Sequence, residues 1–480
     1  MEVKPFRERV TIPDPQIMEM LEACGRNILQ AREIKDEIYE FQVGPTSYRG
    51  LWMLDGHFLL EAAHIMGRSE EAYQGLLAVL KRAKPNGSIR IIPQHDKETG
   101  IAMATLVRQC ELMNDDDRLR ELWPMLQRGL AFIRTLRKEA KGLGTEYPGY
   151  DLFPPAIGDG GIWYHPEYTT PLWIMFGLKS AYLAGKRLGL DGILSFKAMF
   201  DEIMEGFLRW TERDMKVTEG GSRYFPMCME NVPANKPQTA NWAYAHAIYP
   251  GEVLGADDEY VSDFLSLMDE VDDEQGIPKE TGWTKDQSLW GYSSMFYAQV
   301  WLYAGRPDKA IDYLYAFANH AAPSRVWIEE QYFKDSHSNE HGGDMPHNWA
   351  SAEFIRLVRH LLVMEKGEDL VVFPGLPDEW LPDDTPLVLE NTPTRYGLIT
   401  LELHRDEGHG YRLTFKRLAG SQVPERLIIH WNGLLLDADA EVERQGTVIV
   451  LPGDRMDFTL HLGGRQNEIN LASDHGGTTV

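Results

Sequence analysis

Apolar residues recur at helical spacing over the first three quarters of the chain. Up to about residue 366 they return every three or four positions, which is the period of a helix that buries one face. The pattern predicts twelve amphipathic helices, at 14–40, 51–67, 69–84, 98–114, 116–141, 168–189, 191–214, 239–255, 258–272, 287–304, 307–321 and 347–365.

The predicted helices alternate in character along the chain. Segments rich in Gly, Ala and aromatic residues, such as 51–67, 168–189 and 287–304, each precede a more charged segment. A helix that is apolar on all sides is buried, whereas one with a polar face lies outside. The sequence therefore predicts a mainly α domain over residues 1–367, with six helical hairpins closed into an (α/α)6 barrel. An open α-solenoid is the alternative, and the unequal loop lengths argue against it.

The last quarter of the chain follows a different pattern. After Gly367 apolar and polar residues alternate in short runs separated by Gly, Pro, Asn and Asp. Alternation with a period of two indicates strands with one buried face. We therefore predict an antiparallel β-sandwich domain over residues 368–466 and a flexible tail over 467–480.

Composition excludes several classes of function. The 480 residues carry a formal charge of −25, which disfavours nucleic acid and anionic membranes as partners. No apolar run reaches the length of a membrane span and no signal core is visible, so a cytoplasmic location is predicted. The three cysteines are far apart in the sequence, and we expect neither a metal nor a cofactor. The oligomeric state stays open.

The loops that precede the proposed inner helices concentrate aromatic and acidic residues. The chain has 13 Trp, 20 Tyr and 18 Phe, and many of them lie in these loops beside Asp, Glu and His. In a closed ring the six loops emerge at one end, so their side chains should converge on one mouth. Aromatic rings that stack and carboxylates that accept hydrogen bonds suit a sugar, and two carboxyl groups can cleave a glycosidic bond.

Three stretches resemble the six-hairpin (α/α)6 glycosidases, which include glucoamylases, α-L-rhamnosidases, glycogen-debranching glucosidases and processing α-glucosidases. Residues 49–56 are similar to the Trp-x-x-Asp turn of glucoamylases, and Glu167 stands where those enzymes place their acid. Residues 327–332, followed by 347–350, are similar to their base motif. Beyond these three stretches, residues 372–381 also resemble the junction between barrel and sandwich in rhamnosidase-like members.

The sequence also departs from these families. The large N-terminal β-domain that is common among them is missing from this sequence. The acid motif of the rhamnosidases is absent, and Glu167 lacks the second acidic residue that is typical of glucoamylases. The general acid is therefore the least defined part of the predicted site.

The resemblance implies catalytic roles for carboxyl groups in two loops. Glu330 is the predicted general base, with Glu329 as the alternative in the same motif. The predicted general acid is Glu167, because the aromatic residues around it would raise its pKa, or Asp159 in a glycine-rich turn. Glu167 could instead stabilise the start of a helix.

Further loop residues are predicted to contact the sugar. Asp55 would bind hydroxyl groups, unless it only stabilises a helix start, and Arg49 could hold Asp55 in place. The complete predicted set of substrate-binding residues is Arg49, Trp52, Asp55, His57, Trp163, Tyr164, Trp242, Trp283, Lys285, Trp290, Glu329, His347 and Trp349.

The sequence thus predicts an exo-acting glycoside hydrolase that inverts the anomeric centre of an oligosaccharide or glycoside. Two alternatives remain. One is a sugar epimerase or uronic-acid-processing enzyme, which would use paired histidines drawn from His57, His95, His165, His246 and His347. The other is a carbohydrate-binding protein without catalysis. The sugar and its linkage stay open.

Overall fold

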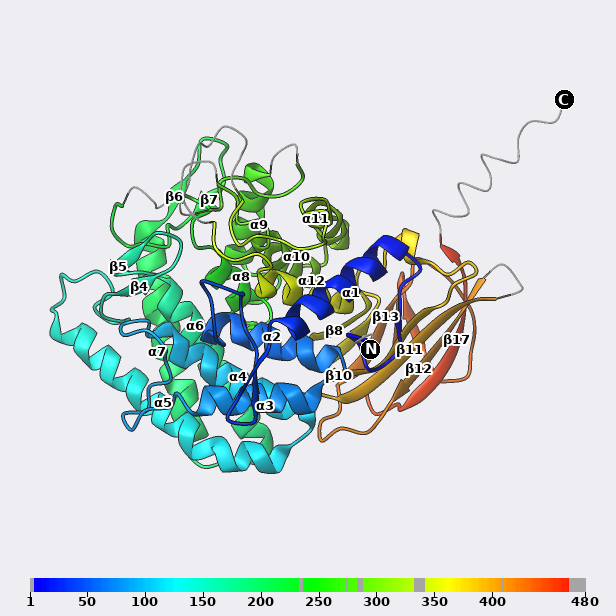
Figure 1. Cartoon of the computed structure of the whole chain (residues 1–480), viewed down its shortest axis with the longest axis horizontal. Coiled ribbons are helices and arrows are strands. Elements are labelled where there is room, and N and C mark those ends of the chain that lie inside the picture. Colours follow the sequence, from blue (N-terminus) through cyan, green and yellow to red (C-terminus); the bar gives the residue numbers. More distant parts are fainter. Residues whose placement is uncertain are drawn as a thin grey trace.

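The chain consists of a helical part and a β part that lie side by side (Figure 1). The computed structural model describes residues 4–232, 236–272, 275–282, 288–331, 342–406 and 410–465. Within these ranges there are twelve α-helices, as the apolar pattern predicts, and most strands follow them in the sequence. The predicted tail at 467–480 lies outside the described residues. None of the described helices combines the length and the apolar character that a membrane span requires.

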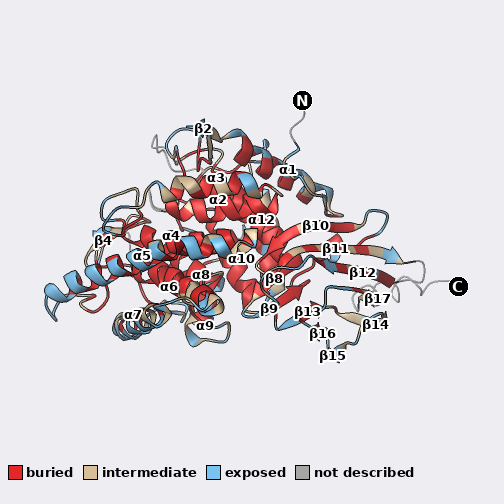
Figure 2. Cartoon of the chain, turned by 90° about the horizontal axis from the view of Figure 1, so that it is seen from below, coloured by how far each residue is buried: buried red, intermediate tan, exposed pale blue. Residues whose placement is uncertain are grey.

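Six helices form an inner ring. They are α2 (Met53–Ile65), α4 (Lys97–Met113), α6 (Thr169–Leu188), α8 (Trp242–Ile248), α10 (Ser293–Tyr303) and α12 (Asn348–Leu362). Each packs against the next, and α12 packs against α2, so the contacts run through a full circle. Helices α2 and α10 are buried on all sides, which explains why their sequences show no polar face (Figure 2).

The other six helices lie outside this ring. They are α1 (Pro15–Gln30), α3 (Ser69–Leu80), α5 (Asp116–Gly142), α7 (Ile193–Asp214), α9 (Glu259–Val271) and α11 (Pro307–Asn319). Figure 2 shows exposed residues along α5 and α7, in keeping with their charged sequences. At Gly189, which ends α6, φ is +63°, a left-handed conformation that glycine adopts without a Cβ clash.

The first helix is shorter than the sequence predicts. Helix α1 ends at Gln30, and the residues after it form the hairpin β2 (Glu33–Lys35) and β3 (Ile38–Glu40). Asp36 and Glu37 both adopt positive φ and make the two-residue turn. Two further small hairpins pair β4 (Ala156–Gly158) with β5 (Trp163–His165), and β6 (Lys216–Val217) with β7 (Arg223–Tyr224).

The β part contains two sheets. Their strands are β1 (Val10–Thr11), β8 (Val363–Lys366), β9 (Asp369–Val372), β10 (Leu387–Thr394), β11 (Gly397–Asp406), β12 (Gly410–Arg417), β13 (Arg426–His430), β14 (Gly433–Ala438), β15 (Glu443–Gln445), β16 (Val448–Pro452) and β17 (Asp457–Arg465). The six-stranded sheet has the order β1-β10-β11-β12-β17-β14, and the five-stranded sheet has the order β15-β16-β13-β9-β8. Buried residues alternate along β11, as expected for a strand with one face on a core.

Two features of the β part differ from the predicted antiparallel domain at 368–466. Strand β9 pairs with β13 in parallel. Strand β8 begins at Val363, directly after α12, and β1 near the N-terminus pairs with β10. The sheets therefore include residues from both ends of the segment 1–367, which the sequence predicts as the barrel.

Candidate functional site

A cavity of about 260 Å³ lies at the end of the helical ring where the loops enter the inner helices. Each of the six inner helices contributes to it, through its first turn or through the loop before it. The lining residues are Tyr48, Trp52, Leu54, Asp55, Ile92, His95, Glu98, Ile157, Gly158, Asp159, Gly160, Gly161, Trp163, Trp242, Trp290, Tyr292, Glu329 and Trp349. The predicted convergence of the loops on one mouth is confirmed.

Aromatic rings form much of the cavity wall. Trp52 packs edge-on against Tyr48 at 5.3 Å between ring centroids, and Trp242 packs against Trp290 at 4.4 Å. A Cβ on Gly160 would come within 2.7 Å of the Trp242 ring, so glycine lets the loop approach the indole. These rings give the cavity several faces on which a sugar could stack.

Asp344 joins the loop before α2 to the loop before α12. Its carboxylate accepts hydrogen bonds from the backbone N–H groups of Thr46, Ser47 and Tyr48 at 3.2, 3.0 and 2.7 Å. Burial alone would raise the pKa of Asp344, but the Thr46 hydroxyl and these backbone donors hold it below its usual range. In the same segment the backbone N–H of Glu329 donates to the carbonyl oxygen of Asp344 at 3.1 Å. The positions of Tyr48 and Glu329 are therefore fixed relative to each other.

Glu329 lies in the cavity as a buried carboxyl group that favours its protonated form. Burial raises its pKa well above the usual range, and the neighbouring carboxyl groups of Asp55 and Glu330 raise it further. A hydrogen bond from the Tyr48 side chain opposes this shift without reversing it. The protonated form, which can donate a proton, therefore persists to higher pH than in an ordinary glutamate.

Asp159 has the opposite electrostatic surroundings. The fully buried ammonium of Lys97 lies 2.6 Å from Asp159 Oδ2, and His95 Nε2 lies 3.2 Å from Asp159 Oδ1. Lys97 is fixed by donating to the carbonyl oxygen of Ile157 at 3.0 Å and to Thr169 Oγ1 at 3.2 Å. Burial would raise the pKa of Asp159, but Lys97 and His95 hold it well below its usual range.

His95 bridges two carboxylates at this wall. Its Nδ1 lies 2.9 Å from Glu98 Oε1, and its Nε2 faces Asp159. Burial and the Lys97 charge lower the pKa of His95, yet the carboxylates of Asp159 and Glu98 outweigh them and raise it to about 9. At neutral pH the imidazole is therefore charged and donates from both ring nitrogens.

A third carboxyl group, Asp55, lies in the first turn of α2. Burial raises the pKa of Asp55 to about 7. His347 Nε2 lies 3.9 Å from Asp55 Oδ1, and burial lowers the pKa of His347 to about 3, so this imidazole stays neutral. Asp55 can thus both accept and donate hydrogen bonds near neutral pH, as a ligand of sugar hydroxyls would.

The raised pKa of Asp55 predicts a pH-dependent stability. Because its pKa is about 7 in the folded chain against 3.8 ordinarily, folding favours the protonated form. This contribution is complete below the ordinary pKa and is lost as the pH rises through 7. We expect the Tm of the wild type to fall by a few degrees relative to Asp55→Asn between about pH 5 and pH 8. Asp117→Asn, at an exposed helix start, should not change this pH dependence; equal slopes for all three proteins would contradict the assignment.

Half of the predicted site residues line the cavity. These are Trp52, Asp55, Asp159, Trp163, Trp242, Trp290, Glu329 and Trp349. His347 lies directly behind Asp55, and its ring packs against Tyr292 at 4.6 Å between centroids. Trp283 and Lys285 lie outside the described residues.

Two of the predicted catalytic residues do not line the cavity. Glu330 is buried, and its Oε1 accepts a hydrogen bond from Ser288 Oγ at 2.6 Å. Glu167 accepts hydrogen bonds from the backbone N–H groups of Thr169 and Thr170 and so stabilises the start of α6. Burial raises the pKa of Glu167, as predicted, but its side chain serves the helix. Glu329 and Asp159, the alternatives, do line the cavity, together with Asp55 and Glu98.

Three predicted substrate contacts also lie elsewhere. Arg49 is half exposed and pairs with Glu33. His57 lies deeper in the ring, where its Nδ1 is 3.0 Å from Thr105 Oγ1. Tyr164 is 48% exposed and does not reach the cavity. Each of them lies within two positions of a lining residue in sequence but points in another direction.

The sequence interpretation missed several lining residues. Tyr48, Glu98 and Tyr292 belong to the same aromatic and acidic loops, but nothing singled them out there. Among the described residues, His95 is the only candidate histidine that lines the cavity, whereas an epimerase would use two. No group of His, Cys, Asp and Glu in the described ranges has an arrangement that could hold a metal ion.

Comparisons with known proteins extend only to structure. No sequence profile of a known family and no curated protein matches this chain. The α-L-rhamnosidase of Streptomyces avermitilis, solved with L-rhamnose, matches 94% of this chain with a TM-score of 0.59 and 12% identity. That of Dictyoglumus thermophilum matches 95% with a TM-score of 0.57 and 12% identity. The chain spans 42% and 50% of these two enzymes.

A smaller solved glycosidase is similar over nearly its whole length. One of its variants matches 72% of this chain and 97% of its own, with a TM-score of 0.54 and 14% identity. Another variant, solved with glucose, has a TM-score of 0.52 and 13% identity. At these identities the likeness concerns the fold, which is the fold that the sequence resemblance implies.

Proposed function

We propose that this protein is a glycoside hydrolase that removes a terminal sugar. The observation that carries the proposal is one cavity, lined by aromatic rings, into which two different loops bring Asp159 and Glu329. We infer that the inner ring closes as an (α/α)6 barrel, because the contacts run from α2 to α12 and back. In such a ring α6 and α12 are three steps apart, so the loops before them face each other. The fold of the solved glycosidases supports the proposal.

The surroundings of the two carboxyl groups suggest their roles. A general acid needs a raised pKa, and a general base must be ionised at the working pH. Glu329 meets the first requirement because it is buried, and Asp159 meets the second because Lys97 and His95 hold its charge. We therefore assign the proton donor to Glu329 and the base to Asp159, which exchanges the roles that the sequence resemblance implies for the two loops.

The reaction then proceeds in one displacement. Glu329 gives its proton to the glycosidic oxygen while the bond from that oxygen to the anomeric carbon breaks. Asp159 takes a proton from a water molecule whose oxygen attacks the same carbon from the other side. The sugar leaves with inverted configuration, and the proton on Asp159 returns to Glu329 through solvent. Such a mechanism requires the carboxyl groups to lie about 6.5–9.5 Å apart.

The cavity suits the end of a glycan chain with a neutral sugar. Trp349 lines it and stacks on Phe58, at 5.5 Å between centroids and 6° between planes. A uronate would need a cation at this site. Among the described lining residues the single cationic side chain is His95, and Asp159 and Glu98 already neutralise it.

A panel of aryl glycosides and oligosaccharides, including glucosides, rhamnosides and uronides, tests the proposal. We expect hydrolysis of a neutral glycoside, with ¹H NMR showing the inverted anomer as the first product. Formation of an epimer without hydrolysis would instead indicate an epimerase. Saccharide binding without turnover of any substrate would indicate a binding protein, and both results would overturn the proposal.

Trp163 offers a test of where the leaving group binds. Trp163 is the first residue of β5 and is 64% exposed at the rim, so its removal should cost little stability. If its ring stacks on the leaving group, Trp163→Ala should raise KM about fivefold for a disaccharide, because stacking contributes about 1 kcal/mol. KM for a methyl glycoside, which lacks a second ring, should stay unchanged. Equal effects on both substrates would contradict this placement.

A further inference from the structure

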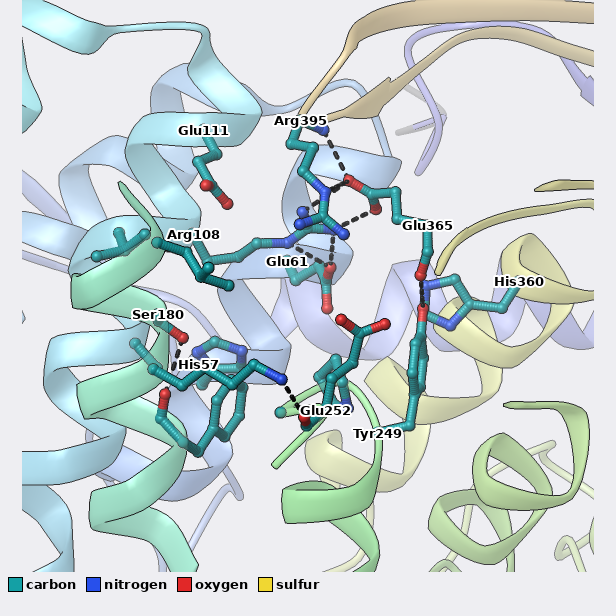
Figure 3. A pocket seen from close by; sticks show the side chains of 17 residues that line it. His57, Glu61, Arg108, Glu111, Ser180, Tyr249, Glu252, His360, Glu365 and Arg395 are labelled. Carbon is teal, nitrogen blue, oxygen red and sulfur yellow. Dashed lines mark hydrogen bonds and ion pairs between the residues drawn. The ribbon is translucent and has the colours of Figure 1, made fainter. Parts of the chain in front are cut away.

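A second cavity, of about 90 Å³, lies deeper in the helical ring, against the β part (Figure 3). Its walls come from α2, α4, α6 and α12, from residues 249–252 after α8, from β8 and from the turn between β10 and β11. Charged side chains dominate it, and Figure 3 shows Arg108 between Glu61 and Glu365, with Arg395 beside Glu365. These groups are part of a longer chain of ion pairs that leads away from this cavity.

The chain of ion pairs links three neighbouring helices of the ring, α12, α2 and α4, to β8. Arg108 donates to Glu61 Oε1 at 2.9 and 2.6 Å, and to both oxygens of Glu365 at 2.9 and 2.7 Å. The other oxygen of Glu61 accepts from Arg356 Nε at 2.5 Å. Arg356 Nη1 then donates to Glu353 Oε2 at 2.5 Å. We call these five residues, Glu353, Arg356, Glu61, Arg108 and Glu365, the charge ladder.

The charge ladder connects the first cavity to the β part. At one end Glu353 Oε1 accepts a hydrogen bond from the indole N–H of Trp349 at 3.0 Å, and Trp349 lines the first cavity. At the other end Glu365, in β8, accepts from the backbone N–H of Arg395 at 2.7 Å. Every step between the Trp349 indole and the β10–β11 turn is therefore a hydrogen bond.

Stability alone does not explain such an arrangement. Glu353, Arg356, Glu61 and Glu365 are at most 4% exposed, and Arg108 is largely covered. Desolvating buried charges offsets much of their mutual attraction, so apolar residues of similar size often give equal or greater stability. What a ladder of directional bonds adds is a fixed geometry. Here the geometry that it fixes is that of a ring in the wall of the first cavity.

We propose that Glu353 is a positioning residue for Trp349, and that Arg108 and Glu365 couple this ring to the β part. Glu353 orients the indole plane by accepting its N–H. Arg356 holds Glu353, and its guanidinium also lies 4.6 Å from the centroid of the Phe58 ring. Trp349 stacks on this same ring. The β part thereby acts on the first cavity without contributing a residue to its lining. The proposal rests on the proposed function only for what Trp349 does to a substrate.

The coupling can be measured without any activity. The indole ¹H–¹⁵N resonance of Trp349 is identified by its loss in Trp349→Phe. We expect this resonance to shift in Glu353→Gln, and also in Glu365→Gln and in Arg108→Lys, which keeps the charge but cannot bridge two carboxylates. Arg426→Met removes an exposed ion pair with Asp369 in the β part and should leave the resonance in place. An unchanged resonance in both Glu365→Gln and Arg108→Lys would overturn the coupling.

Kinetics with a glycoside that the protein hydrolyses then shows whether the charge ladder positions Trp349 or only stabilises the fold. Glu353→Gln and Glu365→Gln should raise KM about 5- to 20-fold and leave kcat within about threefold of the wild type, because the Trp349 ring binds the sugar but does not react. Lower thermal stability with unchanged KM would show that the ladder serves the fold alone and would overturn the positioning role. If the wild type hydrolyses no glycoside, the proposed function fails, while the resonance shifts still decide the coupling.

Discussion

Glu329→Gln should lower kcat about 100- to 10,000-fold, because this change removes the proton that the leaving group needs. Glutamine keeps the size of the side chain and can still accept a hydrogen bond from Tyr48, so the fold should be preserved. The pKa of Glu329 is raised by burial. The wild type should therefore lose activity at alkaline pH as this group ionises, and the variant should lack that limb of the pH profile.

The neighbouring residue provides the matched control. Glu330→Gln makes the same change one position further on, at a side chain that binds Ser288 outside the cavity lining. We expect its kcat to stay within a few-fold of the wild type. A large loss in Glu330→Gln with full activity in Glu329→Gln would make Glu330 the catalytic carboxyl group of this segment, where the sequence predicts it as the general base.

The leaving group distinguishes a lost acid from a lost base. A dinitrophenyl leaving group departs without protonation, whereas an alkyl alcohol does not. If Glu329 is the donor, the defect of Glu329→Gln should largely disappear on a dinitrophenyl glycoside and persist on a methyl glycoside. An equal defect on both substrates would show that Glu329 is not the donor.

The helical period of the apolar residues predicts most of the fold, because the presence or absence of a polar face tells outer helices from inner ones. Helices buried on all sides, such as α2 and α10, lack a polar face in sequence, and the outer helices have one. The periodicity does not reveal where a helix gives way to a short hairpin, as after Gln30, where the hairpin turns at Asp36 and Glu37 with positive φ. It also does not reveal that β1, far away in sequence, pairs with β10.

The direction of single side chains explains the remaining errors in the site. Near Glu329 and Glu330 the chain pairs with two other segments, since the N–H of Glu330 donates to Gly342 O and Gln331 exchanges hydrogen bonds with Leu289. Successive side chains of an extended segment point to opposite faces, so only one of the two glutamates can face the cavity. Which one does so is set by this pairing, and the motif contains no information about it.

A helix imposes the same restriction on Asp55 and His57. Residues two positions apart on a helix do not share a face, so Asp55 faces the cavity while His57 faces the interior of the ring. In the same way Trp163 and Tyr164 are adjacent in β5, and only Trp163 reaches the cavity. The residue types are enough to identify the loops that form the site. Which side chains face the cavity depends on how these segments pair with other parts of the chain.

Asp159→Asn should lower kcat about as strongly as Glu329→Gln, because it removes the group that takes the proton from water. Azide attacks without losing a proton, so it should restore turnover in Asp159→Asn and give a glycosyl azide of inverted configuration. It should not do so in Glu329→Gln acting on a methyl glycoside. Rescue by azide in Glu329→Gln instead would exchange the two roles.

Lys97 determines whether Asp159 can act as this base. Its ammonium lies 2.6 Å from the carboxylate and is fully buried, and it helps to hold the pKa of Asp159 well below the usual range. In Lys97→Met that pKa should rise, so the acid limb of the kcat profile should move up by about one pH unit or more. Lys197→Met, at an exposed pair with Asp201 on α7, should leave the limb unchanged. Because the change also leaves Asp159 without its nearest cation, a lower Tm is expected; an unmoved acid limb in a folded Lys97→Met would show that another group accepts the proton.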